Sequence, residues 1–147
     1  MKRFSFKLEK ILELRKFREE ECKLALGQAI SALNAIENEI MKTAVRRHEA
    51  AEQRLANPQE MREWDYYILR LDREAESLAE QAAQAEMIVE EKRELYLEAS
   101  RELKAVEKLK EKKQKEYRKE LLDYEMAEID ELVSADPDNN ISELNNE

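Results

Sequence analysis

The sequence predicts an all-α protein, a long antiparallel two-helix coiled-coil hairpin whose second helix overhangs the first. The chain of 147 residues is 41% charged and contains one Gly and two Pro, a composition typical of long helices. An apolar seam recurs in alternating steps of four and three residues from Trp64 to Val106, and another runs from Cys22 to Ile40. The strongest helix break between these seams is Asn57-Pro58, so the seams can face each other within one chain.

The first helix is expected over about residues 5–56 and the second over about residues 58–133. Pro58 suits the first position of a helix, which makes Asn57 the expected N-cap and places Glu60 where it can close a capping box. The hairpin is therefore expected to span residues 1–133 as one domain. Residues 134–147 contain Asp136-Pro137-Asp138 and further acids, and they are expected to form a disordered acidic tail.

An antiparallel hairpin pairs residues whose numbers have a constant sum, which allows a register to be predicted. A turn centred near residue 57 pairs Leu33 with Ala82, and Leu26 with Val89. The same register pairs Ile36 with Leu78, Ala29 with Ala85 and Ala50 with Trp64, and it brings Phe4 to about Lys110. Residues beyond about 112 then lack a partner, although Tyr117, Leu121, Tyr124 and Ile129 continue an apolar stripe. This overhang is either a docking element or a helix that frays alone.

Charge is strongly segregated along the chain. Residues 1–18 hold seven Lys/Arg and two Glu, residues 104–119 hold eight Lys/Arg and three Glu, and residues 120–147 hold ten acids and no base. The hairpin brings the two basic segments together, and this basic end either docks onto an acidic surface or is a solvated face balanced by the acidic tail. Nucleic acid is not an expected partner, because the net charge is -9 and no nucleic-acid module is visible.

Enzymatic chemistry is not expected, and neither is a cofactor, a metal or a small-molecule substrate. His48 is the only histidine, and Glu52 stands where a zinc-protease helix needs its second histidine. Cys22 lies on the seam, where a thiol usually packs, and no Gly-rich loop is present to hold a phosphate. A single cysteine, the lack of an apolar run long enough to span a membrane and a charged N-terminus favour a cytoplasmic protein.

Apolar residues off the seams are the most informative surface feature. Met41 and Val45 on the first helix, and Tyr66 and Leu69 on the second, are all expected near the turn. They form either a protein-binding patch or the scattered surface apolars that are common in proteins.

Two parts of the chain resemble a known family. They are the opening run Phe4-Ser5-Phe6-Lys7-Leu8-Glu9-Lys10-Ile11-Leu12-Glu13-Leu14-Arg15, and the later stretches Glu107–Lys113 and Ile129–Leu132. The first is similar to the opening of the FliJ family, a stalk-like component of the bacterial flagellar type III export apparatus, and the others are similar to its closing part. The length and the single turn also match.

The resemblance implies a non-enzymatic protein shaped like the central stalk of a rotary ATPase. In the family, both chain ends enter the hexameric export ATPase, the turn end binds the cytoplasmic domain of the export gate, and members escort export chaperones. Carried onto this sequence, the ATPase-docking residues are Lys7, Lys10, Arg15, Arg18, Lys104, Lys108, Lys112, Lys113 and Arg118. The gate-binding residues are Met41, Val45, Tyr66, Tyr67 and Leu69, although Met41 and Val45 stand where the family has aromatic residues. The location implied is cytoplasmic, at the inner membrane of the flagellar base.

Two alternatives remain open. A structural coiled coil could self-associate through its overhang, whereas an isolated hairpin is expected to be a monomer. The equivalent stalk protein of a virulence type III secretion system would have the same sequence features.

Overall fold

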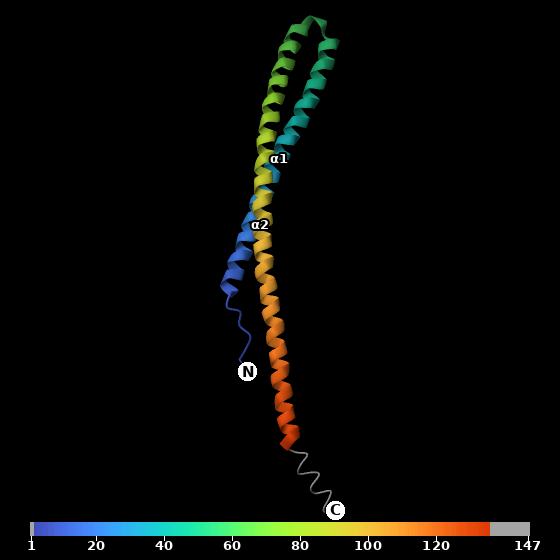
Figure 1. Ribbon diagram of the computed structural model, residues 1–147. Coiled ribbons are helices and arrows are strands. Elements are labelled where there is room, and N and C mark those ends of the chain that lie inside the picture. The colour runs from blue at the N-terminus through green and yellow to red at the C-terminus, as the bar shows by residue number, and fades with distance from the viewer. Residues whose placement is uncertain (1, 136–147) are drawn as a thin grey trace, which may run out of the picture. The chain divides into compact units, whose positions relative to one another are not determined.

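The computed structural model describes residues 2–135, so most of the expected acidic tail lies outside the described residues. Within this range the chain forms helix α1 (Glu9–Ala56), the short 3-10 helix η1 (Pro58–Glu60) and helix α2 (Met61–Ala135), and no strand is present there (Figure 1). The predicted all-α fold with two long helices is confirmed. The chain divides into two compact units, a terminal unit (Met1–Leu14 with the chain from Glu102 on) and a turn unit (Arg15–Arg101).

The turn unit is a helical hairpin with a narrow core of mostly small side chains. Its buried residues are Thr43, Ala50, Leu71, Ala85, Val89 and Ala99. Two ion pairs tie the helices together beside this core: Arg47 Nε lies 2.6 Å from Asp72 Oδ1, and Arg54 Nε lies 2.5 Å from Asp65 Oδ1. Because a coiled-coil seam buries one narrow stripe of each helix, most other side chains of the unit remain exposed.

The observed register differs from the predicted one. The numbers of each ion-paired set, 47 with 72 and 54 with 65, sum to 119. Continued in the same steps, the first seam passes through Arg47 and Arg54, and the second contains Leu71 and Trp64. Each arginine bonds to the aspartate that directly follows the seam residue opposite it. The numbers of two seam residues that face each other directly therefore sum to 118. Leu33 therefore faces Ala85 instead of Ala82, about one helical turn from the predicted partner, and the predicted pairings were wrong by that amount.

The turn explains this shift. α1 continues to Ala56 and η1 occupies the next three residues after Asn57, so the midpoint of the hairpin is residue 59 and not residue 57. The predicted capping box is also absent: Asn57 makes no side-chain cap, and its amide instead donates to Gln53 O and Gln53 Oε1 at 3.0 and 3.1 Å. The Asn57 side chain thus closes the end of α1, while Glu60 N donates to Asn57 O at 3.0 Å.

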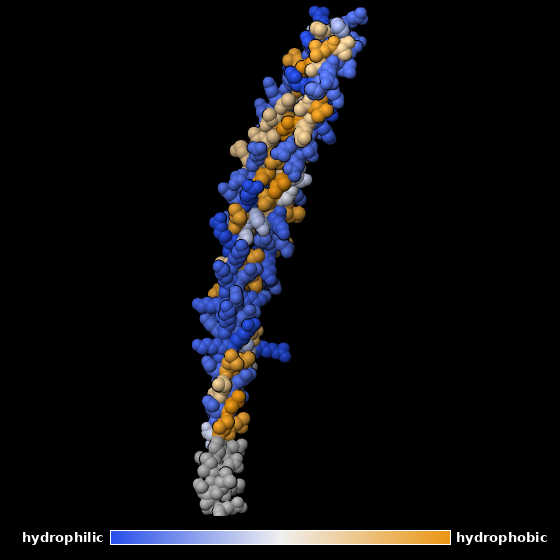
Figure 2. Space-filling model, turned by 90° about the vertical axis from the view of Figure 1, so that its right-hand side faces the viewer, coloured by the Kyte–Doolittle hydropathy of each residue, from blue (hydrophilic) through white to orange (hydrophobic). Residues whose placement is uncertain are grey.

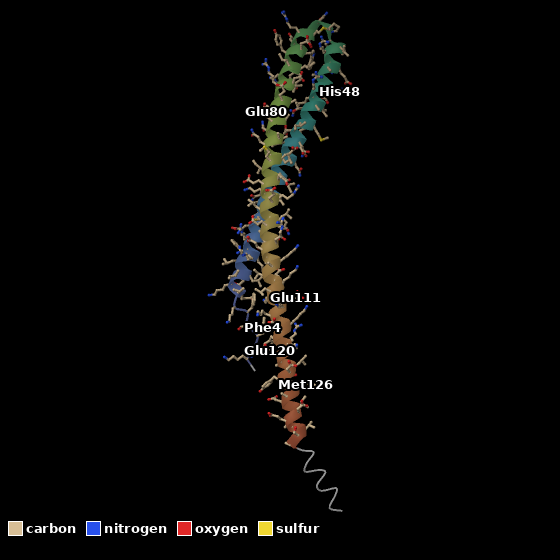
Figure 3. The ribbon with its side chains drawn as sticks, viewed as in Figure 1. Phe4, His48, Glu80, Glu111, Glu120 and Met126 are labelled. Atoms are coloured by element: carbon tan, nitrogen blue, oxygen red, sulfur yellow. The ribbon has the colours of Figure 1, made fainter. Side chains whose placement is uncertain are left out.

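In the terminal unit, α1 begins at Glu9 and not near Ser5, and the residues before it form an arm along α2. The Phe4 ring lies 5.6 Å from the Tyr117 ring, and Tyr117 Oη donates to Lys2 O at 2.6 Å. Phe4 was expected near Lys110. Glu9 pairs with Lys110 instead, so the observed register alone moves Phe4 to about residue 115. The arm reaches still further along α2, because an extended residue spans about 3.3 Å against about 1.5 Å for a helical one. Figure 3 shows Phe4 beside α2, between Glu111 and Glu120.

The arm changes where the overhang starts. Half-buried positions continue along α2 as far as Leu121, and all of the described residues from Leu122 on are exposed. The unpartnered part of α2 is therefore residues 122–135, about ten residues shorter than the sequence suggested. Met126 projects from this part of α2 (Figure 3).

Candidate protein-interaction surfaces

The first candidate surface is the basic face of the terminal unit. This unit contains seven of the nine predicted docking residues, namely Lys7, Lys10, Lys104, Lys108, Lys112, Lys113 and Arg118, and all of them are exposed. The other two, Arg15 and Arg18, belong to the turn unit. Lys110 is also basic, but its Nζ lies 2.9 Å from Glu9 Oε2, so this lysine ties α2 to the first turn of α1.

A hollow between the arm and α2 adds an apolar element to this basic face. It measures about 630 Å³ and is lined by residues that include Phe4, Phe6 and Leu109, with Lys7 and Lys113 beside them. An apolar floor next to two ammonium groups suits an apolar side chain carried by an acidic segment of another protein. Sequence reasoning missed this hollow, because it assumed that residues 5–8 continue the helix. Phe4 and Phe6, which lie five and three residues before the start of α1, were the available signal.

The second candidate surface lies in the turn unit and is apolar. Met41, Val45, Tyr66 and Leu69 are all exposed, Met41 and Tyr66 by 68% each. Tyr67 is half-buried, whereas the other four predicted gate-binding residues are exposed. Exposed side chains of this size are available for contact with a partner, and Figure 2 shows hydrophobic residues interspersed among hydrophilic ones on one face.

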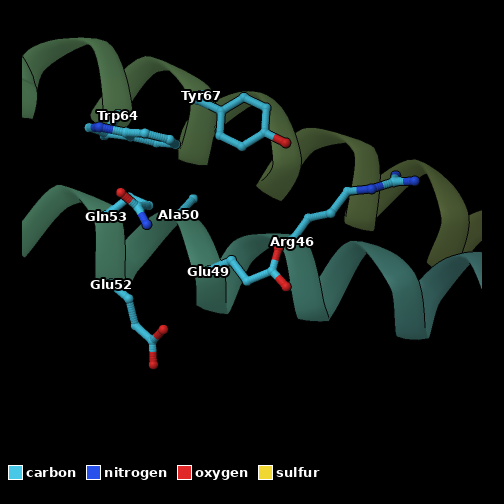
Figure 4. A pocket seen from close by; sticks show the side chains of 7 residues that line it. All are labelled: Arg46, Glu49, Ala50, Glu52, Gln53, Trp64 and Tyr67. Atoms are coloured by element: carbon cyan, nitrogen blue, oxygen red, sulfur yellow. The ribbon is translucent and has the colours of Figure 1, made fainter.

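Tyr67 belongs to an aromatic cluster near the turn. Its ring lies 6.0 Å from the Trp64 ring at an interplanar angle of 78°, and the Arg70 guanidinium lies 5.4 Å from its centroid. Both rings border a groove of about 490 Å³ whose other wall comes from α1 and includes Ala50 and Gln53 (Figure 4). The edge-to-face rings are held in place by each other and by the arginine, which gives the turn end a rigid aromatic wall.

The cross-helix ion pairs fix the groove's walls. Asp72 accepts a hydrogen bond from Arg47 and raises the pKa of that guanidinium above its ordinary value. Arg54 makes the corresponding contact with Asp65, seven residues nearer to the turn along α1. Both arginines are therefore committed to the hairpin and are not available to a partner.

The overhang is a third surface, acidic and apolar. Leu122, Met126, Ile129 and Val133 follow one another in helical steps and are each more than half exposed. Every charged residue among 120–135 is an acid. The Tyr124 hydroxyl donates a hydrogen bond to Glu128, and this contact raises the pKa of the hydroxyl above its ordinary value.

Residues 2–135 include the single histidine and the single cysteine of the chain. No group of three or more His, Cys, Asp or Glu side chains in this range could hold a metal ion. His48 lies on the surface with its Nε2 3.1 Å from Glu52 Oε1, and Cys22 is half-buried. Within the same range, neither helix has a stretch apolar and long enough to cross a membrane.

Comparison with known protein families gives a match. The family model described as "Flagellar FliJ protein" matches residues 4–140, nearly the whole chain.

The chain belongs to the FliJ family.

As a FliJ-family chain, it is a stalk protein of flagellar or type III export, and the expected resemblance is confirmed. None of the curated proteins compared with it matches. Among solved structures, it is similar to a putative YscO homolog, CT670, from Chlamydia trachomatis, at 20% sequence identity over 98% of this chain and 94% of that chain. The TM-score is 0.41, too low for that likeness to support any residue assignment.

Proposed function

We propose that this FliJ-family chain is a non-enzymatic coupling protein that uses its two units for two different partners. The terminal unit docks into the hexameric export ATPase, and the turn unit binds the cytoplasmic domain of the export gate protein. The observation that carries the proposal is the contrast between the units: exposed lysines beside an apolar hollow in one, and exposed apolar and aromatic side chains in the other.

Docking of the terminal unit rests on charge and on the hollow. Lys104, Lys108 and Lys112 are exposed on α2, and the hollow accepts an apolar side chain between Lys7 and Lys113. Such a surface is complementary to an acidic lining, and its contribution to binding falls with ionic strength.

Gate binding by the turn unit rests on apolar contact. Tyr66 and Leu69 are three positions apart on α2, which makes them neighbours on one helix face. Aromatic side chains of this kind commonly supply most of the binding energy of an interface. Association with the gate would hold the chain at the inner membrane. Escort of export chaperones belongs to the same proposal, and we assign no residues to it.

A binding assay with the export ATPase and the gate domain tests the proposal. Replacing Lys104, Lys108 and Lys112 by Glu is expected to weaken ATPase binding by about tenfold or more, since three attractive contacts become repulsive. The matched control replaces Lys23, Arg62 and Arg73, exposed residues of the turn unit, by Glu, and it changes the net charge equally. Equal loss in both variants would show that only net charge matters and would refute ATPase docking by the terminal unit.

Binding to the gate domain is tested with Tyr66→Ala and Leu69→Ala, singly and together. Both residues are exposed, so the hairpin is expected to keep its helicity while gate binding weakens. Met87→Ala removes a side chain of similar size that is 74% exposed elsewhere in the unit. Gate binding that is insensitive to Tyr66 and Leu69, or equally sensitive to Met87, would contradict the assignment.

A further inference from the structure

The charge of α2 changes sign at one point. Residues 104–119 hold eight Lys/Arg and three Glu, whereas residues 120–135 hold six acids and no base. α2 is a single helix through both segments, so the acidic segment cannot fold back onto the basic segment of its own chain. The arm of the same chain contacts α2 at Tyr117 through Lys2 and Phe4, and the residues of α2 from Leu122 to Ala135 are all exposed. A basic surface alongside residues 122–135 would therefore come from another molecule.

The acidic segment also carries an apolar stripe without a partner among the described residues. Leu122, Met126, Ile129 and Val133 are each more than half exposed, and Figure 2 shows apolar surface along the last described turns of α2. Exposed apolar stripes of this regularity are uncommon on a helix that stays alone in water. A surface that packs on this stripe should itself be basic, because every charged residue among 120–135 is an acid.

We propose that a second copy of this chain supplies this surface, with the two α2 helices antiparallel and a two-fold axis at Lys119. In that arrangement Lys115 of each copy faces Asp123 of the other, and Lys108 faces Asp130. Ala105 faces Val133, and the aliphatic stem of Lys112 covers Met126. The basic and acidic halves are thus complementary in both directions.

Helix geometry places these residues on one face. At about 100° per residue, Lys108, Lys112 and Lys115 all point within about 40° of the direction of Lys119, and so do their counterparts Asp123, Met126, Asp130 and Val133. The structure independently assigns the opposite face of α2 to the hairpin, because Lys110 points about 180° away from Lys119 and is paired with Glu9. Pairing with a second copy therefore leaves the contacts of the terminal unit intact.

The pair is weak and competes with other basic-surface interactions. Exposed ion pairs contribute little individually, and two Lys119 side chains meet at the axis, so the chain is monomeric when dilute and pairs as its concentration rises. Pairing covers Lys108, Lys112 and Lys115, so a paired chain cannot present them to an acidic partner. The inference does not depend on the identity of that partner and goes beyond the coupling function proposed above.

Sedimentation equilibrium of the full chain over a range of concentrations at low ionic strength tests the pairing. We expect the weight-average mass to rise from the monomer towards the dimer, and to return to the monomer in high salt, where the Debye length falls to about 3 Å. A mass that stays monomeric at high protein concentration and low salt would overturn the proposal.

Charge-reversal variants identify the surface. Lys108→Asp/Lys115→Asp and, separately, Asp123→Lys/Asp130→Lys are each expected to lower the association constant by more than about tenfold, since every interfacial ion pair becomes a like-charge contact. Mixing the two variants makes all of these contacts complementary again, so the mixture is expected to form a heterodimer. Arg62→Asp/Arg73→Asp in the turn unit is the control and should pair like the wild type. Self-association of either variant at wild-type strength, or a mixture that stays monomeric, would refute the arrangement.

A cross-link locates the axis. In a Cys22→Ser background, Lys119→Cys places two thiols at the two-fold axis, where a disulfide can form, whereas Lys113→Cys points about 120° away. Oxidation is expected to cross-link the Lys119→Cys chain and not the Lys113→Cys chain. The reverse result, or equal cross-linking of both, would exclude an axis at Lys119.

Discussion

The N-terminal arm is held to α2 by a clamp of two aromatic rings and one hydrogen bond, and its removal should free the arm without unfolding the hairpin. Phe4 packs against Tyr117 at 5.6 Å, and Tyr117 Oη donates to Lys2 O at 2.6 Å. The arm has no helical hydrogen bonds of its own before the contact of Glu9 N with Phe6 O at 3.1 Å. Its attachment to α2 therefore depends largely on this clamp.

The magnitude follows from the two contacts. An intramolecular hydrogen bond contributes about 0.5–1.5 kcal/mol, and an aromatic pair contributes about 0.5–1.5 kcal/mol beyond its buried area. Tyr117→Phe removes only the hydrogen bond, whereas Tyr117→Ala removes both contacts. The free energy of arm opening should thus fall by about 1 kcal/mol in the first variant and by about 1–3 kcal/mol in the second.

Trypsin cleavage after Lys7, followed by mass spectrometry, measures this opening, because cleavage tracks the population of the open form when reclosing is fast. A loss of one to two kcal/mol corresponds to a factor of about 5–30 in that population. Tyr124→Phe is the control, since Tyr124 is exposed and lies beyond the arm. Wild-type cleavage after Lys7 that already equals that of a free peptide, or no acceleration in Tyr117→Ala, would show that the clamp does not hold the arm.

Three further predictions concern the turn unit. Leu71→Ala should cost about 2–5 kcal/mol of unfolding free energy, because Leu71 is 2% exposed, while the exposed Leu69→Ala should change it by less than about 0.5 kcal/mol in the same denaturant titration. Thr43→Val should raise the thermal midpoint, because Thr43 Oγ1 is buried with no hydrogen-bond partner in the described structure and an apolar isostere avoids its desolvation; a lowered midpoint would argue that water reaches the hydroxyl. Arg47→Asp should lower the thermal midpoint and the double variant with Asp72→Arg should restore it, whereas no restoration would contradict the observed register.

The fold class could be predicted from periodicity because the two seams are long and are rarely interrupted by polar residues. From Trp64 to Val106 the seam residues are apolar except Lys92, and no Gly or Pro interrupts that stretch. Such a pattern has one low-energy solution, a helix packed on another helix. The surfaces were predictable for a similar reason: a residue off the seam is exposed wherever the seam faces its partner, and this holds for Met41, Val45, Tyr66 and Leu69.

The register was harder to predict from the sequence, because seams rich in alanine favour no single register strongly. Leu33 packs against an alanine in either case, Ala82 or Ala85, so the side chains themselves gave little preference. The choice depended on how many residues the turn consumes, and η1 together with the Asn57 contact to Gln53 moved the midpoint to residue 59.

The amino-acid sequence by itself determined that this chain forms two long helices, where the chain reverses and how charge is distributed along it, since helical periodicity and helix breaks are local properties. Only the tertiary structure decided the register, the ion pairs of Arg47 and Arg54, and the arm that brings Phe4 to Tyr117. These features depend on the path of the chain through a turn and through residues without helical hydrogen bonds, where a change of one or two residues moves every facing contact.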